Sequence, residues 1–216
     1  MRSTRRQAAA CLKEDLKPYA ILLDETFSLI DLCIDRLETT DSPFGRVCAL
    51  TLVKARNLTL GCYSLSLDAL GQEAGALLRP LIECLELLTY FRLDPTRAED
   101  AIEERLPGAG DIARRIEGKF GGLRKYLNKY ASHLSLAAES CSHLIDFRSQ
   151  RIRLVQTHRT VVLRENLRTI LAILMCVTIE AANCVSVNTQ NVDHALADTV
   201  DALKSRILML LDKPVP

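Results

Sequence analysis

The order of apolar and polar positions along the chain predicts long helices. Apolar residues recur three and four positions apart through most of the sequence, which places them on one face of an α-helix. Pro18 lies within the first of these segments and either kinks it or marks its true start. The pattern predicts long helices at about 4–37, 43–70, 72–91, 160–187 and 191–211, with a shorter helix at 95–106.

The middle of the chain follows this pattern less well. Segment 111–130 is amphipathic, but three glycines weaken it by about 1 kcal/mol each. Segment 143–158 alternates in part and is predicted to form a short β-hairpin or an extended excursion. We therefore expect an all-α fold, a bundle of four to five long helices with short helices and an irregular arm. It is predicted to be a single domain spanning 1–216, with an irregular insertion at about 131–159.

Capping signals separate the predicted helices. Ser42 followed by Pro43 is the combination that favours an N-cap and a first helical turn. Asn191 is predicted to cap the last helix. Because these signals fall between the apolar segments, they support the division into separate helices.

Composition and charge limit the fold classes and functional classes to which the chain can belong. Hydrophobic residues make up 48% of the chain and aromatic residues only 5%, which favours Leu- and Ala-rich helices over a sandwich or barrel. The net charge of +1, from 28 basic and 27 acidic residues, argues against a DNA-binding protein. The longest uncharged run, Thr169 to Ile179, has about half the length of a membrane span, so no membrane partner is expected. Eight cysteines without a C-x-x-C pair indicate free thiols and a cytoplasmic protein.

One predicted helix, 72–91, carries a narrow polar stripe on an otherwise apolar surface. Arg79, Glu83, Glu86 and Tyr90 follow one another at i, i+4, i+7 and i+11, within a sector roughly 60° wide. A helix with so little polar surface is expected to be wrapped by neighbours, which places these side chains in a crevice. The pair of Arg79 and Glu83 has two interpretations, a structural network between helices or part of a ligand or catalytic site.

A small-ligand site is one hypothesis for this region. Tyr130 and His133 follow the weak helix, and the charged side chain of His133 either closes its C-terminus or turns inward across the bundle. If it turns inward, it meets Glu73 or Glu83. The candidate binding residues are therefore Glu73, Arg79, Glu83, Tyr130 and His133.

A second candidate site combines Arg153 and His158, which are separated by four residues. This spacing resembles the signature of HEPN-type ribonucleases. The resemblance implies cleavage of RNA without a metal, in which the histidine moves the proton of the ribose 2′-hydroxyl and the arginine stabilises the charge on the phosphate. These two residues are therefore the candidate catalytic pair. No H-E-x-x-H, E-x-x-H, C-x-x-C or P-loop spacing occurs, so neither a metal nor a cofactor is predicted.

Two parts of the chain resemble known helical proteins. The segment AGALLRPLIECLELLTYFRLDP and a later patch resemble an uncharacterised bacterial helical family that is distantly similar to HEPN-type bundles. The resemblance covers about 50–134 and implies a helical bundle without assigning an activity. The spacing of Arg153 and His158 resembles HEPN ribonucleases, although Leu154 stands where those enzymes carry a polar residue. The residues that match the family motifs are Arg79, Pro80, Leu81, Glu83, Tyr130, Ser132 and His133.

These observations favour a non-enzymatic helical-bundle protein that acts by protein–protein contact or self-association. The second and last long helices are the surfaces expected to pair. The alternative is a HEPN-like metal-independent ribonuclease or toxin-type RNA-processing enzyme, with RNA as its partner. A small-ligand site between helices is the third hypothesis.

Overall fold

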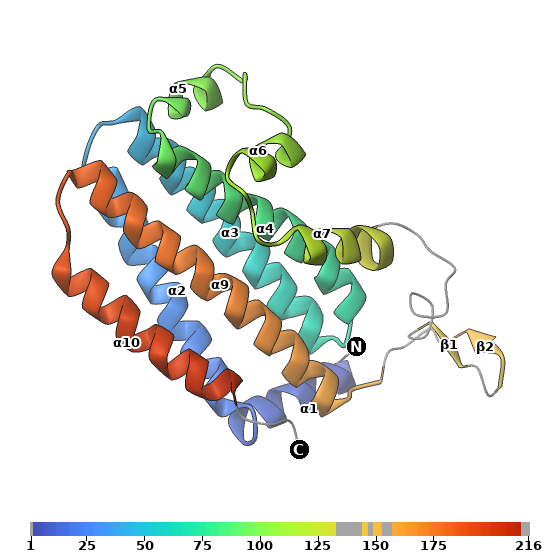
Figure 1. Ribbon diagram of the computed structural model, residues 1–216. Helices are drawn as coiled ribbons and strands as arrows, with labels where there is room; N and C mark the ends of the chain where they lie inside the picture. Colours follow the sequence, from blue (N-terminus) through green and yellow to red (C-terminus); the bar gives the residue numbers. More distant parts are fainter. Residues whose placement is uncertain (1, 133–143, 147–148, 153–156, 213–216) are drawn as a thin grey trace.

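The fold is all-α, in agreement with the sequence (Figure 1). The computed structural model describes residues 2–132, 144–146, 149–152 and 157–212. Five long helices lie side by side along one direction: α2 (Lys17–Glu38), α3 (Pro43–Leu67), α4 (Gly71–Leu93), α9 (Thr160–Thr189) and α10 (His194–Leu211). The predicted bundle of four to five long helices is therefore confirmed.

Side-chain caps mark the starts of α3 and α10. The Ser42 hydroxyl accepts a hydrogen bond from the Gly45 N–H at 2.9 Å and caps α3, as predicted. The predicted cap of the last helix was wrong, because Asp193, rather than Asn191, accepts from the Leu196 N–H at 3.1 Å. The capping carboxylate thus satisfies one of the N–H groups left open at a helix start.

The predicted first helix is divided in two by a turn at 14–16. Helix α1 (Arg2–Lys13) ends there, and α2 begins with Pro18 in its first turn. Proline suits this place because its missing N–H has no helical acceptor there. Of the two interpretations of Pro18, the start of a helix is the one observed.

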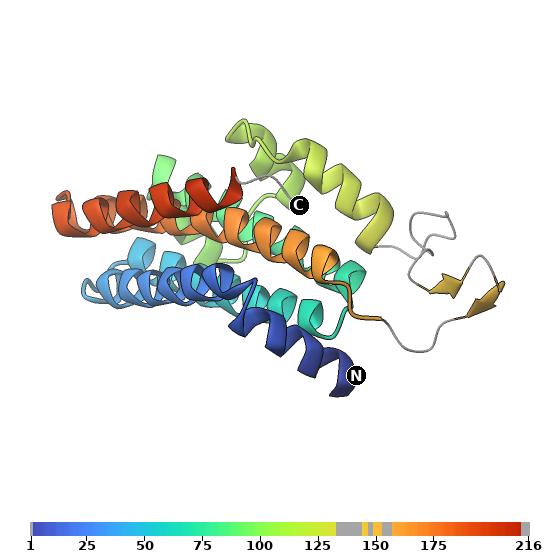
Figure 2. The same cartoon turned by 90° about the horizontal axis from the view of Figure 1, so that it is seen from below.

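Helix α9 lies at the centre of the bundle and packs against α2, α3 and α4 (Figure 2). Its buried face is formed by Leu167, Ile170, Leu174 and Val177 among others. Within the part of the chain that the structure describes, α9 is the one helix long and apolar enough to cross a membrane. Its apolar side chains are largely buried against the other helices, and a core helix meets the same length and composition criteria.

The weak helix predicted at 111–130 is broken into α6 (Ala109–Arg115), α7 (Gly121–Leu127) and a π-helical turn η1 (Asn128–Ser132). The break comes where Glu117 takes a left-handed conformation, with φ of 52°. Together with α5 (Arg97–Ile102), these short elements pack along α4.

A small antiparallel hairpin follows, which is one of the two alternatives predicted for 143–158. Strand β1 (Ile145–Asp146) pairs with β2 (Arg151–Ile152), and Ile145 lies opposite Ile152. Both residues of β2 are exposed. The hairpin therefore lies outside the hydrophobic core (Figures 1 and 2).

Candidate functional site

The polar stripe of α4 passes from partial exposure to full burial along the helix. The Arg79 Nε donates to Glu83 Oε1 at 3.2 Å, and these side chains remain 35% and 26% exposed. Glu86 and Tyr90, one and two turns further on, are buried. The sheltered half of the stripe is thus its C-terminal half, whereas the pair at Arg79 and Glu83 still reaches solvent.

The burial of Glu86 is only partly compensated. Arg124 of α7 donates from Nη1 to Glu86 Oε2 at 2.9 Å, but Glu86 Oε1 has no hydrogen-bond partner among the described residues. Removal from water raises the pKa of the Glu86 carboxyl, and the attraction of Arg124 offsets this only in part. A cavity of about 140 Å³ lies beside Glu83 and Glu86, between α4 and α6.

Two more arginines hold Tyr90, the last residue of the stripe. The Arg97 guanidinium lies 4.3 Å from the centre of the Tyr90 ring, a cation–π contact, and its Nη1 donates to the Tyr90 carbonyl oxygen at 3.0 Å. Arg115 donates to the Tyr90 hydroxyl at 3.3 Å. The buried half of the stripe therefore serves as the docking edge for α5, α6 and α7.

Sequence reasoning located the stripe but missed its partners. Arg97, Arg115 and Arg124 lie on three different short elements, and nothing in their spacing indicates that they converge on α4. The one available signal is indirect. A buried glutamate and a buried tyrosine on an apolar helix require cations or donors from outside that helix.

Of the two candidate catalytic residues, the structure describes His158, which lies away from the stripe. His158 Nε2 lies 3.5 Å from Cys11 Sγ of α1 and 3.4 Å from Thr160 Oγ1 at the start of α9. These contacts tie the start of α9 to α1. Arg153 lies outside the described residues, so the proposed pair with His158 stays a prediction.

The candidate binding residues that the structure describes lie in different surroundings. Glu73 is exposed in the first turn of α4, and His133 lies outside the described residues. Tyr130 lies beside the N-terminal part of α4, where Gln72 Nε2 donates to its carbonyl oxygen at 2.5 Å. Arg79 and Glu83 pair with each other and do not line the cavity that Tyr130 borders.

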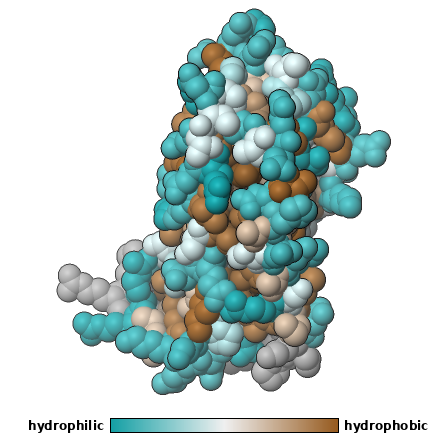
Figure 3. All heavy atoms as spheres, turned by 90° about the vertical axis from the view of Figure 1, so that its left-hand side faces the viewer, coloured by the Kyte–Doolittle hydropathy of each residue, from teal (hydrophilic) through white to brown (hydrophobic). Residues whose placement is uncertain are grey.

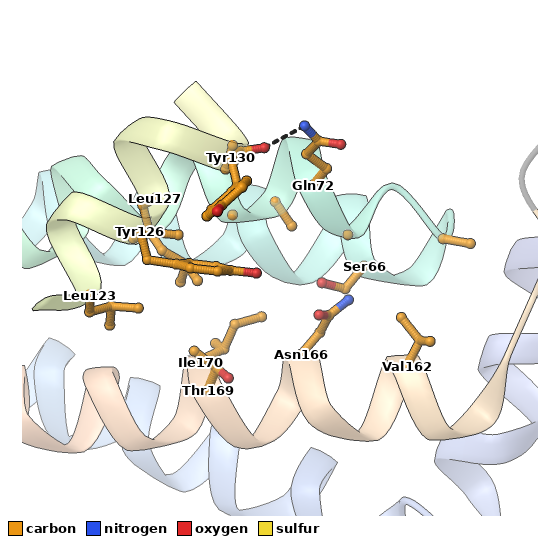
Figure 4. Close-up of a pocket in the computed structure, with 16 residues that line it drawn as sticks. Ser66, Gln72, Leu123, Tyr126, Leu127, Tyr130, Val162, Asn166, Thr169 and Ile170 are labelled. Atoms are coloured by element: carbon orange, nitrogen blue, oxygen red, sulfur yellow. Dashed lines mark hydrogen bonds between the residues drawn. The ribbon is translucent and has the colours of Figure 1, made fainter. Parts of the chain in front are cut away.

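That cavity has a volume of about 440 Å³ and is enclosed by α4, α7 and α9, with the end of α3 closing one side (Figure 4). The ring of Tyr126 extends from α7 into the gap above α9, and Asn166 of α9 points up toward Ser66. The sequence did not indicate this cavity, because its lining comes from three segments far apart in the chain.

A second surface feature is a line of apolar side chains on α3, the α3 stripe, formed by Leu50, Val53 and Leu60. These side chains are 64%, 39% and 40% exposed. Their spacing of three and seven positions places them on one face of α3, opposite the face that packs in the bundle.

No group of three or more His, Cys, Asp or Glu side chains in the described ranges is placed to hold a metal ion. The chain has no significant match to a protein-family model, a curated protein or a solved structure. Its function is therefore argued from the surfaces and cavities described above.

Proposed function

We propose that this chain is a non-enzymatic helical-bundle protein that acts by pairing with a second copy of itself through α3. The single observation that carries the proposal is the exposed α3 stripe. Leu50, Val53 and Leu60 lie within a sector roughly 80° wide at about 100° per residue. Apolar side chains that alternate at three and four positions form the seam of helix pairs.

One polar residue interrupts the seam and gives it a preferred arrangement. Asn57 is exposed and stands between Val53 and Leu60, at the position where the next apolar residue of the repeat would fall. An asparagine at one such position favours a defined register and number of helices in parallel pairs, because the two amides hydrogen-bond to each other. A parallel two-fold arrangement places Asn57 opposite its copy.

The last helix offers a weaker surface. Leu208 and Met209 of α10 are 49% and 62% exposed, but they are adjacent in sequence and do not continue along the helix. On the side of the molecule that carries α10, hydrophobic and hydrophilic side chains are interleaved (Figure 3). Of the two helices singled out from the sequence, α3 therefore supplies the better pairing surface.

The test compares Leu50→Ala with a matched control, Leu208→Ala, by sedimentation equilibrium. Complete burial of a leucine stabilises by about 1.5–3 kcal/mol, so the exposed 64% of Leu50 is worth about 1–2 kcal/mol per copy. Two copies per dimer make the expected loss about 2–4 kcal/mol, a rise in Kd of about 30- to 700-fold. Leu208→Ala is expected to leave Kd unchanged.

A wild-type protein that stays monomeric at about 0.5 mM would contradict the proposal, since even weak specific pairing is populated there. Equal effects of the two substitutions would also contradict it. If wild-type protein pairs and only Leu208→Ala weakens it, the seam lies on α10 instead. Circular dichroism of both variants verifies that the fold is intact.

A further inference from the structure

We propose that the cavity between α4, α7 and α9 binds an uncharged, flat aromatic molecule that carries an amide-like edge. Its volume of about 440 Å³ falls within the range of about 300–1,000 Å³ typical of sites for small organic ligands. The proposal goes beyond self-association, because α4, α7 and α9 supply most of this lining and the α3 stripe takes no part in it.

The charge of the ligand follows from the lining. Leucine, valine, isoleucine, alanine and glycine provide most of it, together with tyrosine, serine, threonine, asparagine and glutamine. Among the residues that the structure describes, no acidic or basic side chain lines the cavity. A charged ligand would lose its hydration there without gaining an opposite charge, which costs several kcal/mol. The cavity therefore favours neutral molecules.

The aromatic character of the ligand follows from Tyr126 and Tyr130. Their ring centres are 4.9 Å apart with the planes tilted by 47°, so they form a corner at the edge of the cavity. The Tyr126 side chain extends into the gap, although the residue remains 59% exposed (Figure 4). A flat ring of the ligand placed against Tyr126 would cover the exposed face of the tyrosine ring. Such aromatic contacts contribute about 0.5–1.5 kcal/mol in addition to the free energy of burying apolar area.

The amide-like edge of the ligand is inferred from the side chain of Asn166. Its side chain points into the cavity and makes no hydrogen bond to the part of the chain that the structure describes (Figure 4). Gly71 lies directly beside it, and a Cβ on that glycine would come within 2.9 Å of Asn166 Nδ2. The free amide offers one acceptor and two donors, which matches a ligand that presents a donor and an acceptor side by side.

The first experiment uses the neutral fluorophore N-phenyl-1-naphthylamine as the probe for the full chain. We expect one saturable site in the wild-type protein. Thr169→Phe fills the cavity from α9 and is expected to weaken binding at least about tenfold. Thr199→Phe is the matched control, because both threonine hydroxyls donate to the carbonyl four residues earlier, but Thr199 lies on α10 outside the cavity.

The second experiment displaces the probe with 1-naphthamide or with the anion 1-naphthoate. The amide is expected to compete at least about tenfold better, and Asn166→Leu is expected to weaken competition by the amide while the fluorophore still binds. If Thr169→Phe does not fold, Tyr126→Ala takes its place, because Tyr126 is largely exposed and its loss should leave the fold intact. Tyr126→Ala should weaken binding of the probe about fivefold or more. Absence of binding, equal binding by Thr169→Phe and Thr199→Phe, or equal competition by the two naphthalenes would overturn the proposal.

Discussion

Removal of Arg124 should destabilise the protein far more than removal of an exposed arginine. Arg124→Ala leaves the Glu86 carboxylate at 4% exposure without the cation that lies 2.9 Å from it. Loss of one member of a buried ion pair costs about 3–5 kcal/mol, because the remaining charge stays buried and unpaired. The Arg124 side chain is 15% exposed, so water can partly take the place of its guanidinium beside Glu86. We therefore expect a loss of unfolding free energy at the lower end of this range, about 3 kcal/mol. In a domain of this size that lowers Tm by about 6–12 °C.

The effect should depend on pH in a defined direction. Burial already raises the pKa of Glu86 above its ordinary value of 4.5, and the loss of Arg124 raises it further. A carboxyl group whose folded pKa is raised contributes most stability below its unfolded pKa, and this contribution is lost as pH rises through the folded pKa. The destabilisation by Arg124→Ala should therefore be larger at about pH 8 than at about pH 5.

Urea unfolding of Arg124→Ala and Arg105→Ala at both pH values provides the measurement. Arg105 pairs with Asp100 on the surface, with side chains 60% and 42% exposed, so its removal should cost less than about 1 kcal/mol. On a Glu86→Gln background, Arg124→Ala should also cost about 1 kcal/mol or less, because no buried charge remains. If Arg124→Ala behaves like Arg105→Ala, or shows no pH dependence, the assignment of Glu86 as a buried, partly compensated charge is wrong.

Two further predictions concern the cap of α10 and the candidate catalytic histidine. Asp193→Ala should lower the free energy of unfolding by about 1 kcal/mol and Asn191→Ala by much less, because Asp193 accepts the capping hydrogen bond; thermal unfolding distinguishes the two. Because His158 Nε2 lies against Cys11 Sγ and Thr160 Oγ1, we expect neither wild-type protein nor His158→Ala to cleave RNA in the presence of a chelator. Cleavage by wild type that disappears in His158→Ala would instead establish the ribonuclease alternative.

Several features of this protein are determined by short stretches of sequence. The helical spacing of apolar residues predicted the long helices, and Ser42 with Pro43 predicted the start of α3. The alternation after residue 143 predicted a hairpin or an extended excursion, and β1 and β2 form the hairpin. These predictions were correct because periodicity, capping and turn formation depend on residues within a few positions of one another.

Other features were decided by the tertiary structure alone. The partners of Glu86 and Tyr90 come from three short elements whose positions depend on how the chain between α4 and α9 packs. The same holds for the cavity, where Asn166 and Tyr126 approach each other only after α7 and α9 pack beside α4. A contact between residues some 40 positions apart has no local signature, because its free energy is gained only when both elements are in place. The sequence therefore determined the helices, and packing decided which of their side chains meet.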